Sequence, residues 1–270
     1  MKKHLKLVVS TLILSCISVM TNLLITDTAT SAIKTEPVDY TSDGEPMEGF
    51  VAYDDTISNT RPGILIVHDW MGLGPFTKQK AMQLAAEGNI AFAVDVYGKG
   101  IRPKDNDEAA KISSKYFNDR GLLRRRMRSA YDKLASMNDV DSKKIVVMGY
   151  CFGGAAALEL ARCGADLVGT VSFHGILSNP NPRDAENIKG SVLILQAADD
   201  PFVPPTQVQA FEKEMKDANI NYQIITYYDA VHGFTNPAAG SDKSKGVAYN
   251  ADADRKSWLD FHTFLTKVLR

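Results

Sequence analysis

The sequence has little of what metal and nucleotide sites need. Its 270 residues hold three cysteines and five histidines, and no C-x-x-C, H-E-x-x-H or Walker pattern occurs. The acidic residues at 54–55 and 105–107 are typical of turns and helix starts rather than calcium loops. The sequence therefore predicts no metal and no nucleotide.

Charge of one sign is also scarce. The formal net charge is −1, and no long run of one sign, repeat or low-complexity segment is present. The densest basic cluster, residues 124–128, lies in a stretch of helical pattern that also carries Leu122, Leu123 and Tyr131. Such a cluster favours a solvated helix face over nucleic-acid contact, so the sequence predicts no nucleic-acid partner.

The first 32 residues have the order of a secretory signal peptide. Lys2, Lys3 and Lys6 form a basic start, residues 7–25 are mostly apolar, and small residues end at Ala32. We predict cleavage after Ala32, a single mature domain of residues 33–270, and export to a periplasm or out of the cell. The apolar run is long for a signal, so an uncleaved membrane anchor is the alternative.

Two of the three cysteines belong to the predicted mature domain. Cys151 and Cys163 are twelve residues apart. On one helix that spacing is roughly 18 Å along the axis, whereas a disulfide needs α-carbons within about 7 Å. The spacing therefore predicts two free thiols in an exported protein.

Short apolar runs alternate with stretches of helical pattern along the mature chain. This alternation predicts an α/β fold with a mostly parallel sheet of about eight strands and helices on both faces. Residues 33–48 are expected to be partly extended. Strands are predicted at 48–53, 64–67, 90–94, 145–148, 167–173, 192–196 and 222–227. Helices are predicted at 76–87, 105–117, 122–137, 155–161, 206–218 and 252–268.

Polar residues of catalytic type follow three of the predicted strands, where such folds carry their sites. Residues 149–153, Gly-Tyr-Cys-Phe-Gly, match the nucleophile elbow G-x-S-x-G with Cys151 in place of serine. Asp199 and Asp200 follow the strand at 192–196, and His232 follows the last strand. Each of these residues alone also fits a role outside catalysis. The cysteine could be a small buried residue, the two aspartates could form a turn, and the histidine could be structural. The order nucleophile, acid, histidine at three strand ends favours a catalytic triad.

Two further histidines stand at strand ends, so either His68 or His174 could line the site. His68 is the better candidate because Asp69, Trp70 and a glycine follow it. His262 lies in the terminal helix and is expected to be structural.

From about residue 37 to its end, the chain resembles the dienelactone hydrolase family. The resemblance rests on the cysteine elbow, on Asp200-Pro-Phe-Val-Pro and on Val-His232-Gly-Phe. It implies an eight-stranded α/β-hydrolase-like core, a Cys-His-Asp triad with Asp200 rather than Asp199 as the acid, and no cofactor. It also implies oxyanion donors at the backbone N–H groups of Trp70 and Phe152.

The resemblance also marks a substrate pocket, and there the sequence departs from the family. His68 and Asp69 begin the loop that matches the family's oxyanion loop, and Tyr97 ends a matching Asp-Val-Tyr stretch. The family usually has Glu at the position of Asp69, which holds the resting thiol. Two arginines bind the substrate carboxylate in the archetypal enzymes, where this chain has Lys99 and Asn236. These departures put dienelactone itself in question as the substrate.

The sequence thus predicts a cysteine-dependent hydrolase of small esters or lactones that forms a thioester acyl-enzyme. The alternative is a catalytically silent binding protein of the same fold, and a redox-active thiol protein is a further rival. A membrane partner is expected only if the N-terminal segment is uncleaved. The sequence predicts no oligomeric state.

Overall fold

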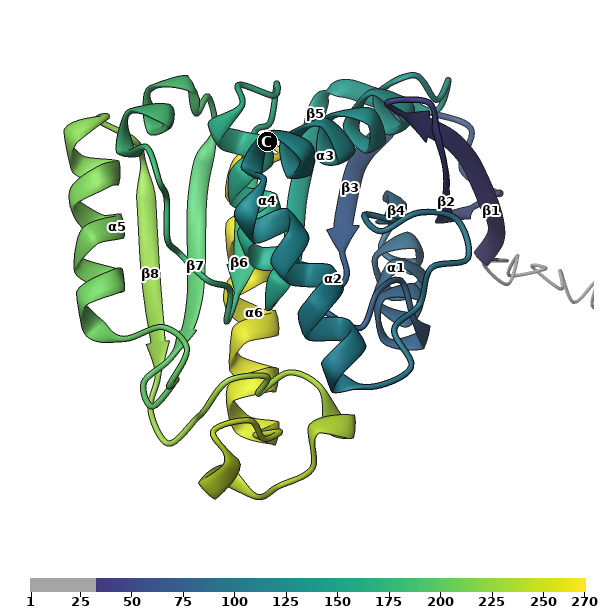
Figure 1. Cartoon of the computed structure of the whole chain (residues 1–270). Coiled ribbons are helices and arrows are strands. Elements are labelled where there is room, and N and C mark those ends of the chain that lie inside the picture. Colours follow the sequence, from purple (N-terminus) through teal and green to yellow (C-terminus); the bar gives the residue numbers. More distant parts are fainter. Residues whose placement is uncertain (1–32) are drawn as a thin grey trace, which may run out of the picture. The chain divides into compact units, whose positions relative to one another are not determined.

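The structure, a computed structural model, describes residues 33–270 as one eight-stranded sheet with helices on both faces (Figure 1). The strands are β1 (Ile33–Ser42), β2 (Glu45–Asp54), β3 (Arg61–Val67), β4 (Ile90–Val94), β5 (Val140–Tyr150), β6 (Gly169–Phe173), β7 (Ser191–Ala197) and β8 (Tyr222–Tyr227). The helices are α1 (Pro75–Ala86), α2 (Asn106–Asn118), α3 (Arg120–Ala135), α4 (Phe152–Arg162), α5 (Pro205–Asp217) and α6 (Ala251–Val268), with short 3-10 turns at Pro182–Asn187, Pro237–Ala239 and Lys243–Lys245. The predicted sheet and its helices are confirmed.

The sheet has the order β1-β2-β4-β3-β5-β6-β7-β8. The pairs β1–β2 and β2–β4 are antiparallel, and β4, β3, β5, β6, β7 and β8 run parallel to one another. All parallel strands therefore end at the same edge, as the arrowheads of β3 and β8 show in Figure 1. Residues 33–48, expected to be only partly extended, form β1 and the start of β2.

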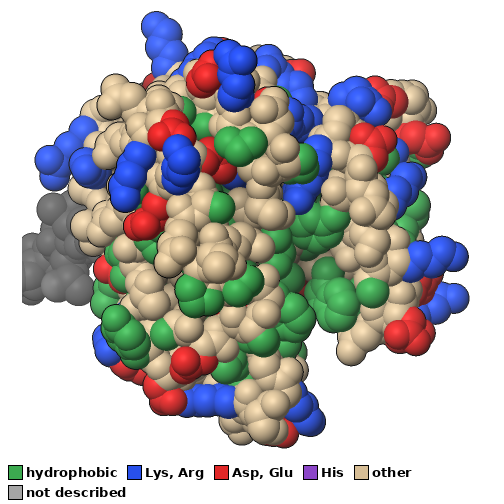
Figure 2. Space-filling model, turned by 60° about the vertical axis from the view of Figure 1, so that its left-hand side comes forward, with side chains coloured by type: hydrophobic (Ala, Val, Ile, Leu, Met, Phe, Trp, Pro, Cys, Tyr) green, Lys and Arg blue, Asp and Glu red, His purple; other side chains and the backbone are tan. Residues whose placement is uncertain are grey.

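Apolar cores fill both sides of the sheet because its central strands are buried on both faces. In β3, Leu65 and Val67 face the core under α2, α3, α4 and α5, while Ile64 and Ile66 face the core under α1 and α6. Figure 2 brings the side with α5 and β8 forward. Both signs of charge are interspersed there, and hydrophobic side chains gather around a hollow.

The basic cluster of α3 is only partly a solvated face, so the sequence prediction was wrong in part. Arg125 and Arg128 are exposed, but Arg126 is buried. Arg124 binds the fully buried carboxylate of Glu159 on α4 at 2.7 Å. The helical period turns Arg124 and Arg126 inward with Leu123 and Met127. The carboxylate that pairs with Arg124 lies on another helix, so local sequence could not predict this ion pair.

The turn between β5 and α4 is tight enough to require glycine on both sides. A Cβ on Gly149 would lie 2.1 Å from the Gly153 carbonyl oxygen, and one on Gly153 would lie 2.3 Å from that of Val67. Between them Cys151 has a φ of 55°, which is unusual for a residue other than glycine. The turn therefore holds the thiol-bearing residue in a strained conformation.

The predictions for residues 1–32, a signal peptide or an anchor, lie outside the described residues. Among residues 33–270, no helix is long and apolar enough to cross a membrane. Cys151 and Cys163 are both free, as their spacing predicted.

Candidate active site

The structure brings Cys151, His232 and Asp200 together from three separate segments. Cys151 immediately precedes α4, Asp200 follows β7, and His232 follows β8. The Sγ atom of Cys151 lies 3.0 Å from Nε2 of His232, and Nδ1 of His232 lies 2.9 Å from Oδ2 of Asp200. This is the contact order of a nucleophile, a base and a group that orients the base.

Asp200 is held by donors other than the histidine. Its Oδ1 accepts the backbone N–H of Phe202 at 2.9 Å, and its Oδ2 accepts Nε2–H of Gln196 at 3.2 Å. Both Asp200 and Gln196 are buried, whereas Asp199 is exposed. Sequence reasoning missed Gln196. The one indication of its role in the sequence is that a polar residue stands in an otherwise apolar strand, four positions before Asp200.

Two aromatic rings pack against the imidazole of His232. The ring of the buried His174 lies 5.1 Å away and that of Phe202 lies 5.0 Å away, both edge-on. His174 does not line an open site, because it is 2% exposed and its Nε2 lies 2.8 Å from Oγ1 of Thr235. Phe202, by contrast, is 50% exposed, so its ring lies at the surface beside His232.

The surroundings of His232 favour its protonated form. Burial acts to lower its pKa, but the charge of Cys151 and hydrogen bonds to Asp200 and Cys151 outweigh burial and raise the pKa to about 10. An imidazolium donates from both ring nitrogens. The arrangement can therefore stabilise negative charge at the sulfur.

The two predicted oxyanion donors have free backbone N–H groups. Within the described residues, the backbone N–H groups of Trp70 and Phe152 donate to no other group. Phe152 is the first residue of α4, whose first N–H groups lack intrahelical partners and whose dipole favours an anion. Tyr97 donates its hydroxyl to the Trp70 carbonyl at 2.9 Å and packs on the Phe152 ring. It is 3% exposed, so it holds both donor segments rather than lining an open pocket.

His68 forms hydrogen bonds that hold this loop from inside the core, so the prediction that it lines the pocket was wrong. It is fully buried. Its Nε2 accepts the Val96 N–H at 3.2 Å, so its Nδ1 carries the proton donated to the Asp69 carbonyl at 2.6 Å. These bonds join the ends of β3 and β4. Burial lowers the pKa of His68 to about 4, which keeps the ring neutral.

Folding stability should fall with acid because of His68. Its folded pKa of about 4 lies below the unfolded value of 6.5. The unfolded chain therefore takes up the proton first, and stability is full above pH 6.5 and falls as the pH drops toward 4. The loss attributable to His68 should be about 3 kcal/mol. Urea unfolding at pH 7 and pH 4.5 measures it. A His68→Asn variant should lose less stability over this interval than wild type; an equal loss would contradict the assignment.

The carboxylate of Asp69, in the loop after β3, forms no ion pair within the described residues. Its Oδ1 accepts the Met71 N–H at 2.8 Å. Burial raises the pKa of Asp69, while the Met71 hydrogen bond and the charge of His232 lower it. No contact joins Asp69 to Cys151, whose sulfur faces His232. The side chain that replaces the family's glutamate thus closes a turn of its own loop.

The structure brings neither Lys99 nor Asn236 into contact with this cluster. The Nζ of Lys99 lies 2.8 Å from Asp39 of β1 and 3.1 Å from Glu48 of β2. The Oδ1 of Asn236 accepts the Ala238 N–H and caps a 3-10 turn. Their predicted place in a substrate pocket has no support from these contacts.

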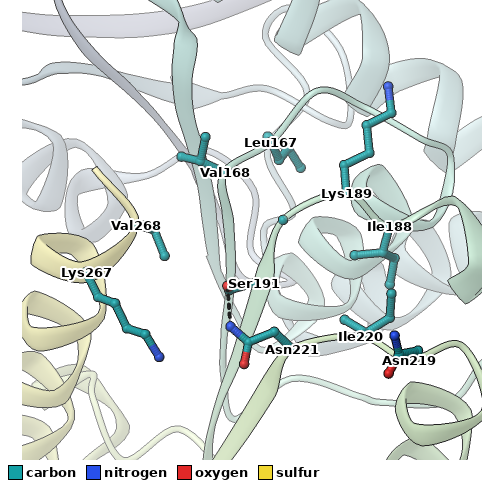
Figure 3. Close-up of a pocket in the computed structure, with 11 residues that line it drawn as sticks. Leu167, Val168, Ile188, Lys189, Ser191, Asn219, Ile220, Asn221, Lys267 and Val268 are labelled. Atoms are coloured by element: carbon teal, nitrogen blue, oxygen red, sulfur yellow. Dashed lines mark hydrogen bonds between the residues drawn. The ribbon is translucent and has the colours of Figure 1, made fainter. Parts of the chain in front are cut away.

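A groove in the described part of the molecule lies elsewhere. It has a volume of about 550 Å³ and is lined by Leu167, Val168, Ile188, Lys189, Gly190, Ser191, Asn219, Ile220, Asn221, Lys267 and Val268 (Figure 3). Apart from Lys267 and Val268 at the end of α6, these residues precede or begin β6, β7 and β8, so the groove sits at the amino ends of these strands, opposite the edge that carries Cys151, Asp200 and His232. Residues 33–270 contain no cluster of three metal-ligating side chains.

The sheet order, the strained elbow and the three side chains at strand ends define an α/β-hydrolase fold. The family model of dienelactone hydrolases matches residues 47–269, and the chain belongs to the dienelactone hydrolase family. Its members hydrolyse esters and lactones, and the chain is accordingly a hydrolase of this class.

Individual relatives agree with this assignment. A carboxymethylenebutenolidase-like protein of Saccharolobus solfataricus is 28% identical, over 85% of this chain and 97% of its own. Protein usf of Aquifex pyrophilus is 29% identical, over 74% of this chain and 86% of its own. Among solved structures, a dienelactone hydrolase-like promiscuous phosphotriesterase from metagenomic libraries is 35% identical. It has a TM-score of 0.85 and covers 88% of this chain and 100% of its own.

Proposed function

We propose that the protein hydrolyses small carboxylic esters or lactones with Cys151 as nucleophile, His232 as general base and acid, and Asp200 as the group that orients His232. The observation that carries the proposal is the unbroken chain of contacts from the sulfur to Nε2 and from Nδ1 to the buried carboxylate. The strained turn and the helix start beneath the sulfur support it, because both occur where nucleophiles are presented.

Acylation follows from this geometry. The proton of the Cys151 thiol resides on Nε2 of His232, whose pKa is raised, and the thiolate attacks the carbonyl carbon of the substrate. The carbonyl oxygen becomes an oxyanion that the N–H groups of Trp70 and Phe152 are free to stabilise; losing one such donor costs about 3 kcal/mol. The carbon–oxygen bond to the leaving group then breaks. The imidazolium protonates the departing alkoxide, and the acyl group stays on sulfur as a thioester.

Deacylation uses the same groups in reverse. His232 takes a proton from water, and the resulting hydroxide attacks the thioester carbonyl. The carbon–sulfur bond breaks, the acid leaves, and the thiolate is again paired with the protonated His232. Cysteine suits esters, enol lactones and thioesters better than amides, since an amide nitrogen is a poor leaving group.

We further propose that the active domain is exported, because the basic and apolar N-terminal pattern is that of a secretory signal. Such a location bears on the redox alternative. A redox role for Cys151 needs a resolving thiol, and Cys163 lies at the far end of α4, beyond disulfide reach.

The test is hydrolysis of p-nitrophenyl esters, simple lactones and an enol lactone with a carboxylate by residues 33–270. Turnover above the uncatalysed rate supports the hydrolase, and the best substrate defines its class. Inertness toward all of them, together with tight binding of one, would favour the silent binding protein.

A further inference from the structure

The carbonyl of Asp69 and the N–H of Trp70 are the two ends of one peptide unit. A trans peptide is planar, so its carbonyl and its N–H point in opposite directions and turn together. The Asp69 carbonyl accepts Nδ1–H of His68 at 2.6 Å and the Gly72 N–H at 3.2 Å. The Trp70 N–H donates to no group within residues 33–270. Holding the carbonyl therefore fixes the direction in which this free N–H points.

The imidazole of His68 is itself held in place. It is fully buried, and its Nε2 accepts the N–H of Val96, which follows β4, at 3.2 Å. This bond leaves the proton on Nδ1, which donates to the Asp69 carbonyl. Hydrogen bonds that form a chain polarise one another. The Val96 N–H, the imidazole and the peptide unit of Trp70 form such a chain, so the bond to the carbonyl also makes the Trp70 N–H a stronger donor.

The same histidine packs against the start of the helix that follows the nucleophile. Its ring stacks on the ring of Phe152, with centroids 5.9 Å apart and an interplanar angle of 18°. A Cβ on Gly153 would collide with the backbone carbonyl of His68. Phe152 directly follows Cys151. His68 thus contacts both segments that carry the proposed oxyanion donors.

We propose that His68 is a positioning residue of the oxyanion hole, which orients and polarises the Trp70 N–H through the Asp69 carbonyl. The inference rests on the proposed function and assigns a further residue to it. The competing explanation is that His68 only joins the ends of β3 and β4. The two explanations depend on different ring nitrogens, because positioning needs the Nδ1 donor and the link to Val96 needs the Nε2 acceptor.

Two amide substitutions separate these nitrogens. In His68→Asn the amide can replace Nδ1 and donate to the Asp69 carbonyl, whereas in His68→Gln it can replace Nε2 and accept the Val96 N–H. With p-nitrophenyl butyrate, His68→Gln should lower kcat about tenfold and leave KM within about twofold, since a weakened oxyanion donor costs less than a deleted one. The kcat of His68→Asn should be several-fold higher than that of His68→Gln.

Alkylation of Cys151 by iodoacetamide is the matched control reaction, because it forms no oxyanion. Its rate should stay within about twofold of wild type in both variants. Equal kcat values in the two variants would overturn the inference while leaving the hydrolase intact. A loss of alkylation in His68→Gln as large as its loss of ester hydrolysis would do the same, since it would show a general disturbance of the elbow.

NMR tests the inference even if a variant does not fold or no ester is hydrolysed. In wild type at pH 7, the ¹⁵N signals of His68 should show a protonated Nδ1 and an unprotonated Nε2; the other tautomer would contradict the inference. If wild type hydrolyses no ester, the proposed function fails, and the backbone ¹⁵N resonance of Trp70 decides. His68→Gln should shift it more than His68→Asn does, because only the former loses the donor to the Asp69 carbonyl; equal shifts would overturn the inference.

Discussion

Replacing Cys151 by alanine should abolish ester hydrolysis, with kcat falling by about 10⁵-fold. The substitution removes the only atom that can attack the carbonyl in the proposed mechanism and leaves the elbow, the oxyanion donors and His232 in place. Steady-state kinetics with p-nitrophenyl butyrate measure the loss. Circular dichroism and urea unfolding establish that the variant folds.

Cys163→Ala is the matched control for this experiment. Cys163 is the other free thiol, at the opposite end of the same helix, with its Sγ 3.1 Å from the Leu160 carbonyl oxygen. Its removal should leave kcat within about twofold of wild type. Comparable activity in Cys151→Ala and Cys163→Ala would mean that neither thiol is the nucleophile.

The second large effect should come from Asp200→Asn, which should lower kcat by about 10⁴-fold. The amide can donate to Nδ1 of His232 and so favours the tautomer whose Nε2 carries the proton and cannot accept one from the thiol. It also removes the charge that helps to raise the pKa of His232. The alkaline limb of the pH profile of kcat/KM, where His232 loses its proton, should therefore move to lower pH as the rate falls.

Asp199→Asn is the control in this case, because the neighbouring carboxylate is exposed. Its activity and pH profile should match those of wild type. A loss in Asp199→Asn equal to that in Asp200→Asn would show that the effect reflects disruption of the turn rather than of the contact with His232.

The sequence was most informative where local pattern and burial agree. The run at 222–227 was predicted with the bounds that β8 has, because an apolar, β-branched segment between turns leaves few alternatives. Cys151, Asp200 and His232 could be found because parallel strands deliver their following residues to one edge. That rule needs only the order of strands along the chain.

Residues whose roles depend on distant partners were missed or misplaced. His68 is a buried link between two strand ends because Val96, 28 positions away, donates to it. Gln196 supports the acid, and Arg124 faces a buried glutamate, through contacts set only by how strands and helices pack. Lys99 was expected beside the substrate, but β1, whose strand character was only partly predicted, supplies Asp39 to bind it. Local sequence carries none of these pairings.

If catalysis passes through a thioester on Cys151, that acyl-enzyme can be trapped. The mature chain would be mixed with a p-nitrophenyl ester, quenched in acid within the first turnovers, digested and analysed by mass spectrometry. One acyl group should be found on the peptide that carries Cys151, released by hydroxylamine and absent from Cys151→Ala. Rapid turnover with the acyl group on another residue, or turnover undiminished in Cys151→Ala, would contradict it.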